Sequence, residues 1–151
     1  MEIRKYTPFP PEQNKVFRPL IWTKFTSLKR ESPHYESLLD SGSDKTISYQ
    51  EIGEYLGINF SDPKTRVFVE SCGYQFEEEL EGLTGKAKAY NHPIKIKIDG
   101  IIEEEVWVKW FKVPLQPGRD FPIILGQDWI FFNFTICFNK YDREFTLNKT
   151  S

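Results

Sequence analysis

The sequence has few of the residues that build zinc centres and histidine-based catalytic triads. Histidine occurs twice, as His34 and His92, and cysteine occurs twice, as Cys72 and Cys137. Neither histidine has a cysteine or another histidine near it, so a metal site or such a triad has little support, and we expect no metal and no cofactor. The cysteines lack CxxC spacing. We expect them to be buried free thiols of a reducing compartment, although one disulfide bridge stays open.

An excess of one charge, a leader sequence and a long apolar run are also missing. Lysine and arginine number 20 against 22 acidic residues, and this formal charge of −2 gives no support to a nucleic-acid partner. Residues 1–15 lack the apolar run of a signal peptide. The most apolar stretch, residues 129–138, contains Asn133 and Thr135 and is too short to span a bilayer. We therefore expect a soluble intracellular protein, such as a cytoplasmic one, with no membrane partner.

Aromatic residues, in contrast, are abundant, and the length suits one domain. The chain has 151 residues, of which 16% are aromatic. We expect a single core and cleft built from rings rather than from aliphatic side chains. Residues 1–17 hold Pro8, Pro10 and Pro11 among polar residues, which predicts an extended N-terminal arm, with a polyproline ligand as the other interpretation. A single domain is expected over residues 18–151.

Most of the chain has the pattern of β-strands separated by turns. Strands are predicted at residues 18–28, 35–39, 66–70, 94–98, 104–113, 134–138 and 144–147. Asp99–Gly100 is a strong hairpin signal. A two-residue loop there would set Glu103 opposite Ile96, so we expect a bulge. The pattern predicts an all-β, mainly antiparallel domain, closed as a barrel or packed as a sandwich, with one or two short helices.

Two segments depart from this pattern. Residues 47–58 change to helical periodicity, with Ser48 and Glu51 placed as a capping box and Gly57 placed as the glycine that ends a helix. Residues 73–90 contain a run of glutamates that fits either a solvated helix face or the exposed side of a long hairpin. The sequence leaves that choice open.

The stretch LLDSGSD, residues 38–44, places a carboxylate at the end of an apolar strand, where aspartate is unfavourable. Gly42 lets the chain turn sharply and leaves its N–H free to bond the carboxylate of Asp40. The hydroxyl of Ser41 can brace the loop. These features suit a preorganised acid–base carboxylate, and they also suit an ordinary Asx turn.

Together with a second motif, this stretch resembles the retropepsin-like aspartic proteases. PIILGQDW, residues 122–129, is similar to the second motif of that family, with Ile124, Leu125 and Gly126 as its apolar triplet. The resemblance extends to a helix after the aspartate, a glycine-containing flap and a closing hairpin, at residues 47–58, 81–100 and 136–147. It covers about residues 18–147. It implies a closed β-barrel-like domain of the retropepsin type.

The resemblance further implies that the chain is half an enzyme. Each member of the family contributes one aspartate and acts as a homodimer, so Asp40 would meet its own copy on a two-fold axis. The two carboxyls would share one proton, activate a water and polarise the substrate carbonyl, without a metal or a covalent intermediate. We expect an aspartic endopeptidase that acts on peptide or protein substrates at acidic to near-neutral pH.

The same resemblance assigns supporting roles to neighbouring residues. Ser41 would hydrogen-bond to the loop of the partner subunit, and Gly42 would offer its carbonyl to the substrate backbone. Ser43 and Asp44 would line the cleft, although Asp44 also fits a solvent-exposed position at the entry to a helix. A flap would close over an extended substrate and would contain Leu83, Thr84 and Gly85.

One position departs from the viral members of the family. Gln127 stands where those members often have an arginine that pairs with the acid corresponding to Asp44, so that ion pair is absent here. The termini, near residues 1–10 and 144–149, would still interleave with those of a second subunit.

Two other functions compete with the protease. The same fold could serve as a non-catalytic dimerisation or peptide-binding module, although such a module has little reason to keep a carboxylate at a strand end. An unrelated β-barrel could instead use its aromatic residues to bind an apolar ligand, which would make the paired motifs a coincidence.

Overall fold

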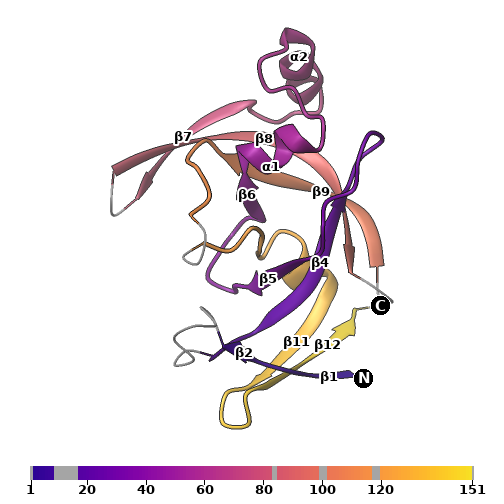
Figure 1. The fold of residues 1–151 in the computed structure, drawn as a ribbon. Coiled ribbons are helices and arrows are strands. Elements are labelled where there is room, and N and C mark those ends of the chain that lie inside the picture. Colours follow the sequence, from indigo (N-terminus) through magenta and orange to yellow (C-terminus); the bar gives the residue numbers. More distant parts are fainter. Residues whose placement is uncertain (1, 9–16, 83–84, 99–101, 117–119, 151) are drawn as a thin grey trace.

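A computed structural model describes residues 2–8, 17–82, 85–98, 102–116 and 120–150 of the chain, most of them in strands (Figure 1). The strands are β1 (Glu2–Lys5), β2 (Thr7–Pro8), β3 (Phe17–Arg18), β4 (Leu20–Thr26), β5 (Tyr35–Leu39), β6 (Ile47–Tyr49), β7 (Glu77–Gly82), β8 (Gly85–Ile98), β9 (Ile102–Phe111), β10 (Ile124–Leu125), β11 (Phe134–Asn139) and β12 (Glu144–Lys149). The helices are α1 (Gln50–Tyr55), α2 (Pro63–Ser71) and α3 (Ile130–Asn133). No helix within these ranges has the length and apolar character needed to cross a membrane.

Six of the described strands close into a barrel. Their hydrogen-bonded order is β4-β5-β10-β6-β9-β8, and β8 pairs back with β4 to complete the ring, while β7 extends the sheet beyond β8. Most pairs are antiparallel, but β10 runs parallel to β5 and β6 runs parallel to β9. Closure satisfies the strand edges within the ring. The predicted all-β class and the predicted closed barrel are therefore confirmed.

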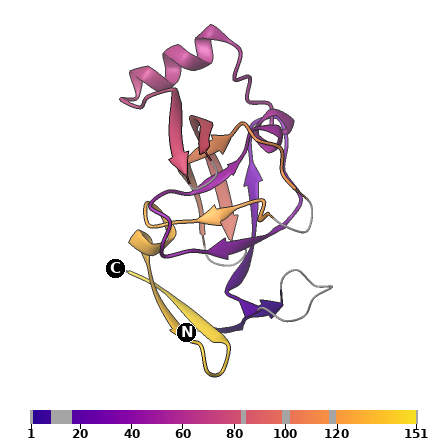
Figure 2. The ribbon, with the colours of Figure 1, turned by 90° about the vertical axis from the view of Figure 1, so that its left-hand side faces the viewer.

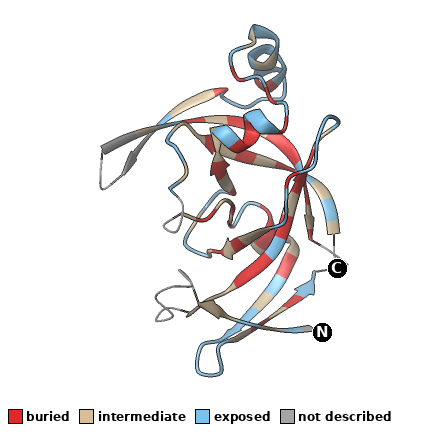
Figure 3. Ribbon diagram, in the orientation of Figure 1, coloured by how far each residue is buried: buried red, intermediate tan, exposed pale blue. Residues whose placement is uncertain are grey.

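Alternating residues of β8 and β9 fill the inside of the barrel. Ile94, Ile96 and Ile98 are buried, as are Val106 and Val108 on the neighbouring strand. Side chains in a strand point to opposite faces in turn, so every second residue reaches the core. Figure 3 shows the buried residues gathered along the barrel strands, whereas the helix at the end of the molecule is mostly exposed. The alternation read from residues 94–98 therefore corresponds to a real interior face.

Rings contribute to this core without dominating it. Phe25 and Trp110 are fully buried with their ring centroids 5.2 Å apart. Among the buried hydrophobic residues of the described chain, however, isoleucine, leucine, valine and alanine outnumber phenylalanine and tryptophan. The expectation of a core built from rings rather than aliphatics was wrong. Several rings lie at the surface instead, including Trp22, Phe132 and Tyr141.

Both cysteines are free, and both are exposed. Cys72 is the C-cap residue of α2, and Cys137 lies in β11. The expectation of free thiols is confirmed and the expectation of burial was wrong. Cys72 ends a helix that stands away from the barrel, which the spacing of two cysteines in sequence does not reveal.

Residues 66–70, expected as a strand, lie in α2. The side chain of Asp62 accepts a hydrogen bond of 2.9 Å from the backbone N–H of Lys64, and Pro63 occupies the first position of the helix. These are strong helix-start signals, and they outweigh the β-branched residues that follow. Figure 1 shows α2 at one end of the molecule, above α1.

The helix expected within residues 47–58 is confirmed as α1, but its capping box is not formed. Ser48 belongs to β6, where its hydroxyl donates to the carbonyl of Pro122. Glu51 instead accepts a hydrogen bond of 2.6 Å from the backbone N–H of Leu115. Gly57 follows the helix with a φ of 95°, as expected of a terminating glycine.

Residues 73–90 resolve as a hairpin rather than as a helix. Strand β7 pairs antiparallel with the first half of β8. Two of its glutamates form ion pairs with lysines that follow or belong to β9, namely Glu77 with Lys112 at 3.1 Å and Glu78 with Lys109. The glutamates of β7 are therefore paired with lysines within and just after β9, on the other side of β8.

Strands β8 and β9 form the hairpin expected around Asp99–Gly100, although these two residues lie outside the described ranges. Ile98 pairs with Ile102, and Ile96 lies opposite Glu104. The register thus differs by one residue from that of a two-residue loop.

A second sheet of order β1-β12-β11 lies below the barrel in Figures 1 and 2. The final hairpin, β11 with β12, is confirmed, and β1 pairs antiparallel with β12 of the same chain. Strands β2 and β3 form a small ribbon beside it. Pro10 and Pro11 lie outside the described residues. The division of the chain at residue 17 and the interleaving with a second subunit stay predictions.

His92 belongs to barrel strand β8, and its side chain contacts α2. Its ring centroid is 5.8 Å from that of Phe68 and 6.4 Å from that of Phe60. Its Nδ1 shares a hydrogen bond of 2.7 Å with the carbonyl of Pro93. Burial lowers the pKa of His92, and the bond to Pro93 and the charge of Glu105 oppose this effect only in part.

We expect His92 to make the fold less stable at acidic pH. Its pKa is lower in the folded chain than the ordinary value of 6.5, so its contribution is full above that pH and is lost as the pH falls through the folded-state pKa. Urea unfolding of the protein and of His92→Phe at about pH 7.5 and about pH 5.5 measures this effect. The unfolding free energy should fall less in the variant, and equal falls would contradict the assignment.

Candidate active site

The two sequence motifs meet at one end of β5. Asp40 directly follows β5, and residues 40–46 form the loop that leads to β6. Strand β10, which carries the second motif, lies between β5 and β6 and pairs with both. The backbone N–H of Asp40 donates to the carbonyl of Leu125 at 3.1 Å. The second motif therefore fixes the point at which the carboxylate leaves the strand.

The carboxylate of Asp40 is oriented by its own loop. The backbone N–H of Gly42 donates to Oδ1 of Asp40 at 2.9 Å, which is the contact that the sequence indicates. The N–H of Ser43 donates to the Asp40 carbonyl at 3.1 Å and closes the turn. Asp40 is half-buried, whereas Ser41 and Gly42 are exposed. The acid is thus held in place at a surface that remains open.

Gly126 packs directly against this loop. A Cβ atom at this position would lie 2.7 Å from the carbonyl oxygen of Ser43 and closer still to that of Lys45. The next residue, Gln127, donates its backbone N–H to the Ser43 carbonyl at 2.8 Å and its side-chain amide to the Ser41 carbonyl at 2.7 Å. Neutral hydrogen bonds from Gln127 therefore brace the loop where an arginine ion pair is absent. Sequence reasoning noted the missing arginine and overlooked this substitute.

Hydrogen bonds of the buried Thr46 hydroxyl support the far end of the loop. Thr46 is fully buried, and its hydroxyl donates to Oδ1 of Asp128 at 2.9 Å and lies 3.5 Å from the backbone N of Gly126. A buried hydroxyl needs such partners, because leaving one unsatisfied costs about 1–3 kcal/mol. Thr46 was not identified from the sequence, since a threonine entering a strand carries no distinctive signal.

The remaining expected site residues are distributed around the loop and the β7–β8 hairpin. The hydroxyl of Ser43 donates to the carbonyl of Lys45 at 2.7 Å, and Asp44 is exposed. Leu83 and Thr84 lie outside the described residues. Gly85 begins β8 at the tip of the hairpin, which projects from the barrel in Figure 1. The flap and the cleft role of Asp44 stay predictions.

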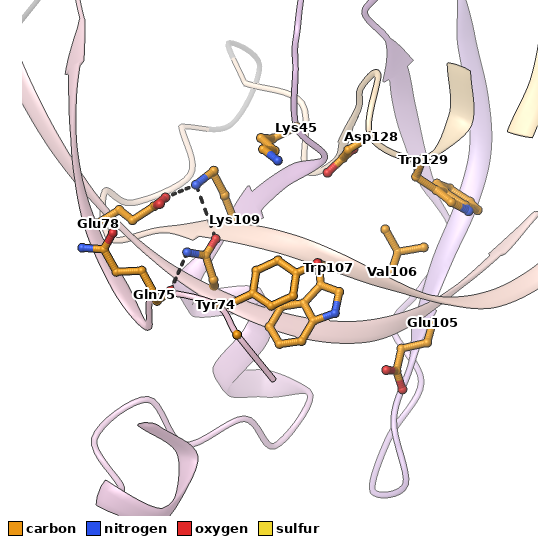
Figure 4. Close-up of a pocket in the computed structure, with 12 residues that line it drawn as sticks. Lys45, Tyr74, Gln75, Glu78, Glu105, Val106, Trp107, Lys109, Asp128 and Trp129 are labelled. Atoms are coloured by element: carbon orange, nitrogen blue, oxygen red, sulfur yellow. Dashed lines mark hydrogen bonds and ion pairs between the residues drawn. The ribbon is translucent and has the colours of Figure 1, made fainter. Parts of the chain in front are cut away.

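A cavity of about 430 Å³ lies beside the far end of this loop. Figure 4 shows Lys45 and Asp128 on one side of it and Lys109 and Trp107 of β9 on the other. The Trp107 ring stacks on Tyr74 with the centroids 3.7 Å apart. Asp40 does not line this cavity, so it is distinct from the catalytic candidate.

The pKa of Lys109, in the wall of this cavity, is lowered. Burial lowers its pKa first, the charge of Lys45 lowers it further, and Asp128 opposes both. Its ammonium forms an ion pair with Glu78 and lies 3.4 Å from the side-chain oxygen of Asn91. The ion pair gives the charge of Lys109 a partner and joins β7 to β9.

Within the described residues, no cluster of three or more histidine, cysteine, aspartate or glutamate side chains could hold a metal ion.

Comparison with known proteins identifies the fold. No protein-family profile matches the chain, and no curated protein matches it by sequence. The retroviral protease-like domain of Ddi1 from Leishmania major is similar in structure, with a TM-score of 0.50 and 15% identity over 89% of this chain and 90% of that one. EIAV protease complexed with the inhibitor HBY-793 gives a TM-score of 0.48 and 16% identity over 83% of this chain and 93% of that one. The chain has a retropepsin-like fold, as the paired motifs predicted.

Proposed function

We propose that the chain is an aspartic endopeptidase that acts as a homodimer. The observation that carries this proposal is the Asp40 loop. Its carboxylate follows a barrel strand, accepts a hydrogen bond from the N–H of Gly42, and is anchored through its backbone to the second motif. An Asx turn alone would not need the close packing of Gly126 and the two hydrogen bonds of Gln127 beneath it. The retropepsin-like fold agrees with this function.

The chemistry follows from placing Asp40 against its own copy. Two carboxyls in contact do not both ionise, so the pair holds one proton. The ionised Asp40 takes a proton from a water held between the carboxyls, while the protonated one polarises the peptide carbonyl. The water attacks to give a tetrahedral diol. An acid of the pair then protonates the leaving nitrogen, and the peptide bond breaks.

The other site residues support this step. Ser41 is exposed, so its hydroxyl is open to the loop of a second subunit. The carbonyl of Gly42 would accept a hydrogen bond from the substrate backbone, with Ser43 and Asp44 beside it. Leu83, Thr84 and Gly85 would form the flap over the substrate, while Ile124, Leu125 and Gly126 keep a structural role as the second motif.

The proposal predicts cleavage of an unfolded protein substrate between about pH 4 and pH 7, blocked by a statine-type inhibitor. Because the pair titrates as a unit, the rate should fall where both carboxyls ionise. Gel electrophoresis at each pH measures the cleavage, and sedimentation measures the dimer. A rate that still rises at alkaline pH, or a monomer at high concentration, would contradict the mechanism. Peptide binding without cleavage would favour the non-catalytic module instead.

A further inference from the structure

The cavity of about 430 Å³ lies between the far end of the Asp40 loop and β7, the first strand of the hairpin that would carry the flap. Lys45 comes from the loop, Asp128 belongs to the second motif, and Glu78 belongs to β7. The proposed function places a peptide between the same loop and the same hairpin, so the cavity lies where that peptide would pass. We call this cavity the polar cavity.

Lys45 is held by contacts of the loop that orients Asp40. Its carbonyl accepts a hydrogen bond of 2.7 Å from the hydroxyl of Ser43, whose own carbonyl accepts from the backbone N–H of Gln127 at 2.8 Å. The Lys45 side chain is exposed, and its ammonium makes no hydrogen bond or ion pair with another described residue. The loop of the candidate acid therefore also brings an unpaired cation to the cavity wall.

Hydrogen bonds fix the opposite wall of the polar cavity. Lys109 forms an ion pair with Glu78 and lies 3.4 Å from the side-chain oxygen of Asn91, whose amide donates to the carbonyl of Gln75 at 2.7 Å. Asn91 is buried, and the Lys109 side chain is 13% exposed. Glu78 lies opposite Ala89, and Lys109 lies opposite Asn91, so both charged groups are on one face of the sheet. This wall is thus preorganised.

The polar cavity offers both hydrogen-bond donors and hydrogen-bond acceptors. An ammonium has three N–H donors, and Lys109 uses two of them on Glu78 and Asn91. Glu78 uses only Oε2 for this bond, and Asp128 uses only Oδ1, which accepts from Thr46. The other oxygen of each carboxylate has no hydrogen bond to a described residue. A ligand group that both donates and accepts can therefore be bonded from two sides.

The charges at this end of the cavity cancel. Lys45 and Lys109 stand beside Glu78 and Asp128, so the four groups together are neutral. Glu105, the fifth charged residue of the wall, lies at the other end of the cavity in Figure 4. An entering carboxylate or ammonium would give this recess a net charge and would compete for one member of the Lys109–Glu78 pair. A neutral polar group would do neither.

We propose that the polar cavity binds the side chain of a glutamine or an asparagine of the peptide substrate, and that the enzyme selects this primary amide at one position near the scissile bond. This inference rests on the proposed function. The amide N–H groups donate to the two carboxylates, and the amide carbonyl accepts from the lysines. The stacked rings of Trp107 and Tyr74 form a flat apolar wall for the aliphatic part of the side chain. An apolar side chain would cover the polar groups without bonding them, which is unfavourable.

Cleavage-site profiling measures this preference. Wild-type protein is incubated with a mixed peptide digest, and the cut sites are identified by mass spectrometry. We expect glutamine or asparagine to be enriched about tenfold at one position over methionine, glutamate and lysine, which have comparable lengths. Glu78→Leu with Lys109→Leu, the cavity variant, replaces the ion pair by apolar groups and leaves no unpaired charge. It should lose the amide preference.

The matched control is Glu77→Leu with Lys112→Leu. This ion pair of 3.1 Å joins the same part of the sheet, and neither residue lines the cavity, because alternate side chains face opposite sides. The control should keep the amide preference. Equal preferences in the control and the cavity variant would overturn the assignment.

Two single substitutions test the charge balance. Lys45→Met leaves the cavity with an excess of negative charge and should shift the preferred residue towards lysine. Asp128→Asn leaves an excess of positive charge and should shift it towards glutamate, while the asparagine oxygen can still accept from Thr46. Circular dichroism checks that both proteins are folded. An unchanged preference in both, or a wild-type preference for glutamate or lysine, would contradict the neutral amide site.

Binding to Asp40→Asn protein distinguishes the failure of this inference from the failure of the proposed function. The probes are fluorescent alanine-rich octapeptides with glutamine or methionine at alternate positions, compared by anisotropy. The ratio of the two affinities should change about tenfold when the cavity variant is added and stay within about twofold when the control is added. Cleavage by wild type without an amide preference overturns the cavity assignment and leaves the protease. An amide preference in binding, without cleavage by wild type, overturns the protease and leaves an amide-binding site.

Discussion

Asp40→Asn is expected to lower kcat/KM for peptide cleavage by at least about 10³-fold, because it removes the carboxylate that accepts the proton of the attacking water. An amide cannot take up that proton at any pH of the assay. Kinetics with a fluorogenic peptide, chosen from the cleavage sites of an unfolded protein, measure the loss. Activity within about tenfold of wild type would exclude Asp40 as the catalytic acid–base group.

The structure makes Asn a well-matched substitution at this position. The Asp40 side chain contributes one hydrogen bond to the loop, in which Oδ1 accepts from the N–H of Gly42. The carbonyl oxygen of an asparagine can accept the same bond. The loop, the barrel and any dimer should therefore survive, and circular dichroism and sedimentation should match wild type. A loss of activity with an unchanged fold assigns the effect to chemistry.

Mixing the two proteins tests whether Asp40 works only against its own copy. If subunits exchange at random and both aspartates are required, activity should fall as the square of the wild-type fraction. If each subunit acts alone, activity should fall in direct proportion. The total protein concentration is held well above that at which the dimer dissociates, so that dilution does not imitate the effect. Quadratic loss would support the shared carboxyl pair, and linear loss would contradict it.

Local features of this fold were readable from the sequence, because neighbouring residues cause them. The alternation over residues 94–98 depends only on which side chains face the core. The loop at Asp40 depends on a glycine two residues later. The end of α1 at Gly57 likewise follows from one residue and its φ. Each of these features appears in the structure as expected.

Features that depend on distant partners were not readable. Residues 66–70 have the composition of a strand, but Asp62 and Pro63 start a helix, and no strand partner within the described chain competes for the segment. Ser48 has the spacing of a capping residue, yet it bonds to Pro122, more than seventy residues away. The exposure of Cys137 depends on which face of β11 turns outward.

The residues of the candidate site fall into the same two groups, those that the sequence indicates and those that only the fold brings together. Its aspartate and both motifs were found from the sequence, because their residue types and order are distinctive. The bracing of the loop by Gln127 and Thr46 was not, since it arises only when β10 inserts between β5 and β6. Arg18 begins a predicted strand in the sequence, and only the fold sets it beside Ser41.

The insertion of β10 makes Gly126 the position where a single methyl group should do most damage to the fold. Its φ is ordinary, so packing rather than backbone conformation requires glycine there. A Cβ would overlap the carbonyl group of Lys45, whose carbon would lie only 2.7 Å away. This group is backbone and cannot rotate away. Relief therefore means moving the Asp40 loop or β10, which breaks the hydrogen bonds that join them.

We expect Gly126→Ala to reduce the unfolding free energy by about 3 kcal/mol or more and to abolish cleavage, since the clash displaces the loop of Asp40. Gly73→Ala is the matched control. Gly73 has a φ of 88°, and a methyl group there would have no atom within 4 Å, so alanine meets only backbone strain, worth about 1–2 kcal/mol. Urea unfolding gives both values. A cost for Gly126→Ala no larger than that of the control would mean that β10 and the loop shift freely, and the rigid placement of Asp40 would then lose its structural basis.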